Sequence, residues 1–527
     1  MTGTGAAGIA TAAAGALAEN RSTTPSAASR ETVGGKQPNL VFVFADQLRR
    51  GSCGYAGDSK AHTPNIDRLA GEGVSFDNAV SSTPVCAPFR ASLMTGKYTT
   101  STGMVINELR LSPEHECIGH VLTRSGYQTG YIGKWHLWAN QLGHHRDPQN
   151  GFVPPGPYRL GFDGYWAAYN FNHRYHEAYY FEDTNKRIDV DGYEPDVQTD
   201  LAIRFVEQAS KANRPFALFL SYGTPHDPWV QDNVPKRFAD LYRDVPFPKP
   251  VNYRPENDPY ADAWGRFKPG ERERLTAWMR FYYAQTASMD FNIGRLLRAL
   301  DGAGVRDDTI FVFTSDHGEM FGAHGRRAKN IFYEEACRIP FLIRWPGKIK
   351  LATDCHACLT TPDIMPTLLG LLGLGIPGEV EGMDLSPLAL GRRGAAPEAA
   401  LLQNTGACAA WTEKHEWRAL RDARFTYAVY RVDGQELLFD HVSDPYQMRN
   451  LIADRAHADT AARFRQMLKR RMAELGDTFA KSTWYRDHWT TDRVILRGAR
   501  GGRHDLKRMN ELLKEHWGDK ARLTRPS

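Results

Sequence analysis

The chain has 527 residues, a formal net charge of +5 at pH 7, 42% hydrophobic residues and 24% charged residues. This composition is ordinary for a globular protein, and the length allows one large hydrophobic core and a smaller second domain. The small charge gives no reason to expect nucleic acid as a partner, and no stretch reaches the roughly 20 apolar residues of a membrane span.

Residues 1–36 are rich in Ala, Gly, Ser and Thr, which predicts either a disordered tail or the remnant of an export signal. The weakly apolar run from Gly8 to Ala18 favours the signal, and Ala16-Leu17-Ala18 is typical of a cleavage site. Because the positive start of such a signal is missing, we expect a truncated one. The protein is then periplasmic or secreted, and a cytoplasmic location is the alternative.

Continuous apolar runs along the chain predict strands that are buried on both faces, as in a parallel sheet. The runs cover residues 39–44, 216–222 and 309–313, and a shorter strand is expected at 128–132. Helix-like stretches at 118–125, 197–209 and 285–300 precede the later strands. Strands that alternate with helices predict an α/β fold, a doubly wound and mostly parallel sheet flanked by helices.

The pattern of predicted elements changes at about residue 375. A hairpin over 417–430, a strand at 435–440 and a helix at about 456–474 predict a smaller α+β domain with an antiparallel sheet. The predicted parts of the chain are therefore the signal or tail (1–36), the α/β domain (37–375), the α+β subdomain (376–477) and a C-terminal extension (478–527). The extension is basic and aromatic, and the sequence assigns it no role.

The stretch from Cys86 to Gly96 predicts a short helix with a cysteine at its positive end. Pro88 suits the first turn of a helix, and Gly96 stands where a C-cap belongs. Arg90 follows Cys86 by four residues, so its guanidinium can reach back over the cysteine side chain. The helix dipole and Arg90 would together hold an anion at position 86, which an inert structural cysteine does not need.

Polar side chains follow the predicted strands, where open α/β sheets form their ligand crevice. Asp46 and Gln47 follow the first strand, and Asp316 and His317 follow a later one. Two carboxylates, an amide oxygen and an imidazole are together able to bind a divalent cation. The sequence therefore predicts a metal site at this edge of the sheet.

Three further polar groups lie at the same edge. Lys134 and His136 are two residues apart, so they share one face of an extended backbone and suit an anionic centre with a proton carrier. His226 stands between Pro225 and Pro228, which restrict the backbone on both sides. Without context, each of these groups is more often a solvated side chain than a catalytic one.

These motifs together resemble the sulfatase family of the alkaline phosphatase superfamily. Cys86-Ala87-Pro88-Phe89-Arg90 is similar to the signature at which sulfatases are modified, and a Cys-based phosphatase places five residues rather than three between Cys and Arg. The segments around Asp46, Lys134, His226, Asp316 and Lys329 occur in the order of the family. The resemblance extends from about residue 38 to residue 453.

The resemblance implies a sulfuric ester hydrolase that acts on a small-molecule or glycan sulfate ester. It implies that a formylglycine-generating enzyme oxidises Cys86 to formylglycine (3-oxoalanine), whose hydrate is the nucleophile. The implied catalytic residues are Cys86, Arg90, Lys134, His136, His226 and Lys329. The implied ligands of a divalent metal, Ca²⁺ in most of the family, are Asp46, Gln47, Cys86, Asp316 and His317.

Two positions depart from the family pattern. Many members have Asp where this chain has Gln47, and Gln there also occurs in related phosphonate monoesterases, which favour Mn²⁺. A phosphonate monoester or phosphodiester hydrolase with the same site is therefore the alternative. Most members have Gly where this chain has Trp138. A non-catalytic carbohydrate-binding relative would need broken motifs, and the motifs are intact.

Residues 141–195 are interpreted as a long insertion rich in Tyr, Asn, His, Gly and Pro, of the kind that shapes substrate choice. Its aromatic and imidazole groups either stack on a sugar ring or pack in the core; they are Tyr165, Trp166, Tyr169, His173, Tyr175 and His176.

The pair Cys355 and Cys358 is interpreted as incidental thiols or a local disulfide. The sequence leaves the natural substrate and the oligomeric state open.

Overall fold

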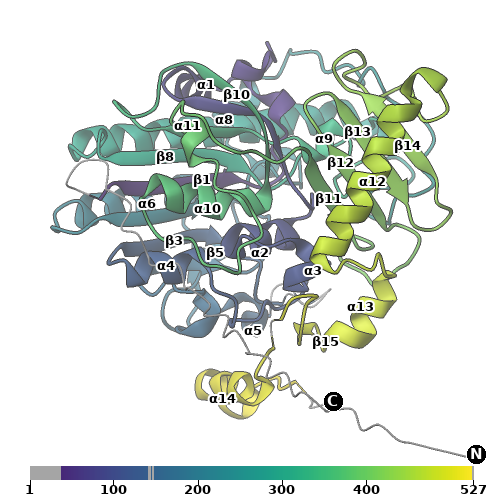
Figure 1. Ribbon diagram of the computed structural model, residues 1–527. Coiled ribbons are helices and arrows are strands. Elements are labelled where there is room, and N and C mark those ends of the chain that lie inside the picture. The colour runs from purple at the N-terminus through teal and green to yellow at the C-terminus, as the bar shows by residue number, and fades with distance from the viewer. Residues whose placement is uncertain (1–36, 140–143, 145–146, 502, 525–527) are drawn as a thin grey trace, which may run out of the picture.

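The computed structural model describes residues 37–139, 144, 147–501 and 503–524, and the expected export signal lies outside them. In the described part of the chain, an eight-stranded sheet has the order β10-β2-β9-β8-β1-β7-β3-β4. Its strands are β1 (Asn39–Ala45), β2 (Val74–Val80), β3 (Gln128–Lys134), β4 (Tyr165–Tyr169), β7 (Phe216–Ser221), β8 (Thr309–Ser315), β9 (Phe341–Arg344) and β10 (Thr353–Thr360). Helices cover both faces of this sheet (Figure 1).

Strand β1 lies inside the sheet and pairs in parallel with β7 on one side and β8 on the other. Val41, for example, is opposite Leu218 in β7 and Phe311 in β8. Every residue of β1 is buried, as its continuous apolar run predicts. Strand β9 runs antiparallel to its neighbours β2 and β8, and the other pairings are parallel. The predicted doubly wound, mostly parallel α/β fold is confirmed.

The side chains of β1 alternate between two hydrophobic clusters, one on each face of the sheet. Phe42 packs in one cluster with residues of α2 (Cys86–Thr95), α4 (Ile118–Arg124) and α10 (Thr361–Leu371). Val43 packs in the other with residues of α1 (Pro64–Gly71), α6 (Glu194–Ala209) and α8 (Leu275–Gly302). Each face of the sheet therefore has its own helical layer.

A second, antiparallel sheet follows in the chain and lies beside the first (Figure 1). Its strands, in order, are β11 (Ala400–Asn404), β12 (Trp417–Arg421), β13 (Phe425–Tyr430) and β14 (Glu436–Asp440). One face, which includes Leu420, packs against Phe464 of α12 (Ala458–Leu475), and the other, which includes Ala419, packs in a cluster with Tyr333. The predicted antiparallel sheet is confirmed, and the exact domain boundaries stay predictions.

The extension after residue 477 packs back onto the α/β part of the chain. It forms α13 (Ser482–Trp489), β15 (Thr490–Thr491), β16 (Val494–Ile495) and α14 (Leu506–Trp517). Val494 and Met509 belong to the same hydrophobic cluster as Phe42 of β1. The remaining short elements are α3 (Thr99–Thr102), β5 (Tyr179–Tyr180), α5 (Pro148–Gly151), β6 (Ile188–Asp189), α7 (Lys236–Asp240), α9 (Glu334–Cys337) and α11 (Ser386–Ala389).

The structure differs from the sequence-based expectation at the predicted insertion over residues 141–195. Strand β4 lies within that range and forms the edge of the main sheet, where Trp166 pairs with Tyr131 of β3. Trp166, Tyr169 and Tyr175 are buried, so these rings are core residues. The segment is therefore part of the scaffold as well as a loop over the crevice.

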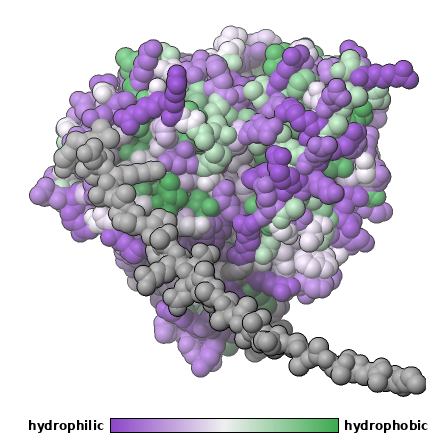
Figure 2. All heavy atoms as spheres, viewed as in Figure 1, coloured by the Kyte–Doolittle hydropathy of each residue, from purple (hydrophilic) through white to green (hydrophobic). Residues whose placement is uncertain are grey.

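Cys355 and Cys358 do not form a disulfide, and all seven cysteines are free. Within the described ranges, no helix combines the length and the apolar character that crossing a bilayer requires. On the face shown in Figure 2, hydrophilic side chains are interspersed with apolar ones.

The antiparallel sheet is tied to the segment after α12 by a buried ion pair, which predicts a stability effect. Arg418 Nη2 lies 2.7 Å from Asp477 Oδ1, and both side chains are fully buried. Because Asp477→Ala leaves the guanidinium buried without its carboxylate, we expect it to lower the free energy of unfolding by about 3–5 kcal/mol. Chemical denaturation followed by circular dichroism measures the change.

Asp487 offers the matched control, because its ion pair with Arg486 is exposed to solvent. Asp487→Ala should change the free energy of unfolding by no more than about 0.5 kcal/mol. Equal effects of the two substitutions would contradict a structural role for the buried pair.

Candidate functional site

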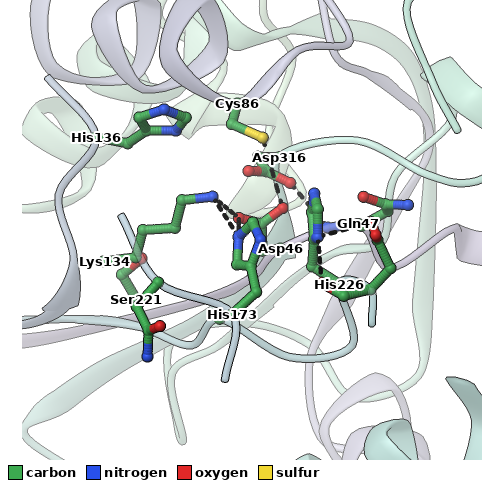
Figure 3. A network of polar contacts seen from close by, with 12 residues as sticks. Asp46, Gln47, Cys86, Lys134, His136, His173, Ser221, His226 and Asp316 are labelled. Atoms are coloured by element: carbon green, nitrogen blue, oxygen red, sulfur yellow. Dashed lines mark hydrogen bonds and ion pairs between the residues drawn. The ribbon is translucent and has the colours of Figure 1, made fainter. Parts of the chain in front are cut away.

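The carboxyl ends of the central strands bring the predicted side chains together in one buried cluster. Asp46 directly follows β1, Lys134 is the last residue of β3, and Asp316 directly follows β8. His226 lies on the loop after β7. The cluster of candidate residues comprises Asp46, Gln47, Cys86, Arg90, Lys134, His136, His226, Asp316, His317 and Lys329, and each of them is buried. Figure 3 shows most of these side chains pointing toward a common centre.

Cys86 is the first residue of α2, as the sequence predicts, and Gly96 caps the helix with a φ of 65°. The cysteine side chain is fully buried. Its Sγ lies 3.2 Å from His317 Nε2 and 3.7 Å from Asp46 Oδ1. The positive end of the helix therefore faces the carboxylate and imidazole groups at the ends of β1 and β8.

The donor set fits a divalent cation. Single ligand atoms of Asp46, Cys86, Asp316 and His317 all lie within 4.8 Å of one another, and all four residues are buried. Two carboxylates without solvent around them repel each other strongly, and a divalent cation between them would relieve that repulsion. The residues at this point are therefore compatible with a metal ion.

Arg90 and Lys134 are the cations that face these carboxylates. Arg90 Nη2 lies 3.5 Å from Asp46 Oδ2 and 3.4 Å from Asp316 Oδ2. Its Nη1 donates to the backbone carbonyl of Lys134 at 2.6 Å and to Ser221 Oγ at 2.8 Å. Lys134 Nζ donates to Asp46 Oδ2. The guanidinium thus holds the carboxylates and the end of β3 in place, in addition to its predicted position near Cys86.

The cations and burial separate the pKa values of the acidic groups. Burial raises the pKa of Asp46, but Lys134 and His226 outweigh it, so the pKa lies well below its usual range. For Cys86, burial and Asp46 also oppose ionisation, and Lys134, Lys329 and His317 lower the pKa well below that of a free thiol. Burial and the neighbouring Asp46 raise the pKa of Asp316. A cysteine at this position therefore differs strongly from an inert buried thiol.

Lys329, His226 and Gln47 form a second group at the same centre. Lys329 Nζ lies 2.7 Å from His226 Nε2 and donates to Gln47 Oε1 at 2.9 Å. Burial and Lys329 lower the pKa of His226, but Asp227 and Asp46 outweigh them and raise it to about 9. The Lys329–His226 pair is therefore a place where a proton can be taken up or given away.

Gln47 departs from the family pattern, and its neighbour Glu319 gives a physical reason. Gln47 Nε2 donates to Glu319 Oε2 at 2.6 Å, and both residues are buried. An Asp at position 47 would place a second carboxylate against Glu319 without a donor between them. The amide of Gln47 accepts a hydrogen bond from Lys329 through its oxygen and donates one to Glu319 through its nitrogen.

The backbone conformation that brings His136 to the site differs from the extended one that the sequence predicts. Strand β3 ends at Lys134, and His136 has a φ of 57°, so the two residues do not share one extended strand. Both side chains nevertheless lie on the same side of the cluster (Figure 3). His136 Nε2 lies 3.4 Å from Glu108 Oε1, a carboxylate that holds the imidazole.

Sequence reasoning left open whether His173 packs in the core or contacts a sugar ring, and the structure brings it into the cluster. His173 Nε2 lies 3.0 Å from Lys134 Nζ, and its ring stacks on that of His226 with 3.7 Å between centroids. Its position on the loop after β4 was the available signal, but β4 itself was not predicted. Glu108 and Ser221 were also missed, because nothing in their local sequence distinguishes them. Glu319 belongs to the same motif as Asp316 and His317, but it was assigned no role.

The comparisons with known proteins agree with this geometry. Residues 38–374 match the family model Sulfatase, and residues 322–474 match the model N-sulphoglucosamine sulphohydrolase, C-terminal. Ulvan-active sulfatase of Formosa agariphila is 38% identical over 453 residues, which cover 85% of this chain and 84% of that protein. Endo-4-O-sulfatase of Bacteroides thetaiotaomicron is 30% identical over 516 residues, which cover 87% of this chain and 95% of that protein.

Solved structures share the fold. The structure of BT4656 in complex with its substrate D-glucosamine-2-N,6-O-disulfate is 25% identical, with a TM-score of 0.72 over 86% of this chain and 99% of that one. Phosphonate monoester hydrolase of Agrobacterium radiobacter is 23% identical, with a TM-score of 0.63 over 83% and 96%, which shows a common fold alone. Because the Sulfatase model covers more than half of the sequence, the chain belongs to the sulfatase family of the alkaline phosphatase superfamily and is a sulfatase enzyme.

Proposed function

We propose that this sulfatase hydrolyses sulfate esters of glycans with a formylglycine nucleophile made from Cys86 and a divalent metal ion. The observation that carries the proposal is the position of Cys86. It lies at the positive end of α2, within 4.8 Å of the ligand atoms of Asp46, Asp316 and His317. The buried cations Arg90, Lys134 and Lys329 surround that point.

The relatives support a glycan as the substrate class. Several carry names that refer to saccharides or polysaccharides: Ulvan-active sulfatase, N-acetylglucosamine-6-O-sulfatase and the glucosamine disulfate complex. The chain covers at least 84% of each of these proteins, so whole relatives rather than fragments are compared. We therefore place this chain with enzymes that act on sulfated sugars.

Asp46, Gln47, Asp316 and His317, together with position 86, would hold the metal ion. When bound, a divalent metal polarises sulfuryl oxygens and lowers the pKa of a coordinated hydroxyl. The family favours Ca²⁺, and the oxygen-rich set of donors suits this ion. Mn²⁺ is the alternative that Gln47 suggests.

In its hydrated form, formylglycine would supply two hydroxyls on one carbon. The oxygen of the first would attack sulfur and carry the sulfate, and loss of the proton from the second would reform the aldehyde C=O and break the C–O bond to the sulfate. An enzyme with a plain serine hydroxyl lacks that second hydroxyl. Arg90 and Lys134 orient the group at position 86, and the cationic Lys134 and Lys329 balance the charge on the sulfuryl oxygens. We also assign the role of maturation partner to a formylglycine-generating enzyme.

The histidines of the cluster carry out the proton transfers of the proposed reaction. The Lys329–His226 pair protonates the departing alcohol oxygen, because a proton is exchangeable between its nitrogens at 2.7 Å. His136, held by Glu108, removes the proton from the second hydroxyl at position 86. His173 fixes the direction of Lys134 and His226 by contact with both.

The proposal predicts the behaviour of Cys86→Ser. We expect this variant to accept sulfate on the serine oxygen but to lose steady turnover by at least about 1,000-fold, since the nucleophilic unit is broken. Mass spectrometry of the peptide that contains position 86 identifies formylglycine in the parent and sulfoserine in the variant. Cys355→Ser, on the half-buried cysteine of β10, is the control and should retain the parent rate.

Turnover of Cys86→Ser at a rate near that of the parent would rule this route out. An unmodified thiol at position 86 in fully active enzyme would rule it out as well.

Asp316→Ala should lose bound metal, because it removes one of two carboxylates from the donor set. Asp316→Asn keeps an oxygen at the same place without the charge, so we expect it to retain more metal than the alanine variant. Elemental analysis of dialysed protein, with the fold checked by circular dichroism, makes the measurement. Metal content equal to that of the parent in both variants would reject Asp316 as a ligand.

Parallel assays separate sulfate hydrolysis from phosphonate hydrolysis. We expect kcat/KM for an aryl sulfate to exceed that for the matched aryl phosphonate by at least about tenfold, a difference of about 1.4 kcal/mol. Release of inorganic sulfate from a panel of sulfated saccharides then identifies the substrate class. A preference for the phosphonate would instead favour the alternative function.

A further inference from the structure

The C-terminal extension borders a pocket beside the active site. The extension lies outside the ranges that the two family models match, which end at residue 474. Its hairpin of β15 and β16 joins the segment before α4: Arg110 N donates to the Arg493 carbonyl at 2.8 Å, and Ile495 N donates to the Arg110 carbonyl at 3.1 Å. The hairpin is thereby a fixed wall of the α/β part.

The pocket has a volume of about 430 Å³. Residues from three parts of the chain line it, among them Arg110, Ala139, His144, Asn150, Arg493 and Arg522. Arg522 pairs with Asp147 at 2.7 Å, and the exposed Asp492 is an acidic residue of the lining. Arg110 and Arg493 remain, and neither forms an ion pair with a carboxylate of the described residues.

Arg110 is the more unusual of these two. Its side chain is 7% exposed, and no carboxylate of the described residues pairs with it. The guanidinium lies 3.7 Å from the centre of the Trp138 ring, Nη1 lies 3.0 Å from Met509 Sδ, and Nε has no hydrogen-bond partner. Burial lowers the pKa of Arg110 to about 10. A buried cation without a counterion is costly unless a ligand supplies the missing charge.

Arg493 reaches the same pocket from the hairpin turn. Asp492 and Arg493 have φ values of 45° and 63°, a left-handed turn that normally selects Asn and Gly. Arg493 Nη1 donates to the Glu108 carbonyl at 3.4 Å, and among the described residues no carboxylate lies within ion-pair distance of the guanidinium. Strained backbone positions are common at functional sites, so the φ of 63° at Arg493 agrees with a functional role for its side chain.

The pocket is adjacent to the reacting centre. The backbone of Glu108 accepts from Arg493, while the carboxylate of the same residue holds His136. Ala139 of the lining follows His136 by three residues, so their Cα atoms are at most about 11 Å apart. The wall of the pocket and the wall of the catalytic cluster are the same stretch of chain.

We propose that this pocket, through Arg110 and Arg493, binds a second anionic group of the glycan whose sulfate ester is cleaved at position 86. The inference rests on the proposed function. The anionic group is a uronate carboxylate or another sulfate on a neighbouring position, because a guanidinium recognises either one bidentately. The enzyme then selects polyanionic saccharides rather than isolated sulfate esters.

The test compares matched substrates. One pair is a sulfated disaccharide with a uronate and its carboxyl-reduced, neutral counterpart, and the other is a disulfated saccharide and its monosulfated form. Sulfate release gives kcat and KM for each, and an aryl sulfate reports on the reaction centre. We expect the parent enzyme to prefer the acidic member of at least one pair by about tenfold or more in kcat/KM.

In Arg493→Gln, the ratio of kcat/KM for the acidic substrate to that for its counterpart should fall to about 1. The fall should come from a higher KM for the acidic substrate, with kcat unchanged, and Arg493→Lys should restore part of the ratio. Arg493 is the better position to substitute because it is less buried than Arg110. Arg486→Gln is the matched control: it also removes an arginine from the extension, but its side chain pairs with Asp487 at the surface and does not line the pocket. It should leave the preference intact.

A parent enzyme that shows no preference in either pair overturns the pocket's role alone, as long as sulfate is released. A preference that survives in Arg493→Gln overturns it too, as does an equal loss of activity on every substrate. If no substrate releases sulfate, the proposed function itself fails, and the role of the pocket fails with it.

Discussion

The structure depends on the burial of many charges at one point. Asp46 and Asp316 are fully buried, and so are Arg90 and Lys134, which lie against them. Such charges are tolerated in a protein interior only when partners are held in fixed geometry. The parallel strands provide that geometry, because their carboxyl ends deliver one side chain each to the same edge of the sheet.

The second sheet and its neighbouring loops complete the arrangement from the other side. Trp417 of β12 packs against Phe332, three residues after Lys329, and donates to the Asn330 carbonyl at 3.3 Å. The segment that carries Lys329 is thereby fixed by a part of the chain that contributes none of the candidate residues. This is a physical reason why the α/β part and the antiparallel sheet occur together in one enzyme.

The buried cluster of candidate residues and the pocket of Arg110 and Arg493 differ in how their charges are compensated. In the cluster, cations and carboxylates balance one another and are arranged for chemistry. In the pocket, the guanidiniums of Arg110 and Arg493 form no ion pair with a carboxylate of the described residues, which suits a ligand that brings its own negative charge. Trp138, a departure from the family pattern, contributes the ring on which Arg110 lies. The proposed selectivity thus depends on Arg110 and Arg493, and on the ring of Trp138 that supports Arg110.

The sequence by itself determined the class of fold and named most members of the buried cluster of candidate residues. Both depend on local signals: apolar runs such as 39–44, the residues that directly follow them, and the helix from Cys86 to Gly96. Only the tertiary structure decided the place of β4, the contact of His173 with Lys134, and the fit of Gln47 to Glu319. It also decided the contact of Arg493 with Glu108, which lies 385 positions earlier. Such contacts depend on how distant segments pack in three dimensions, and nothing in the neighbouring residues of either partner specifies that packing.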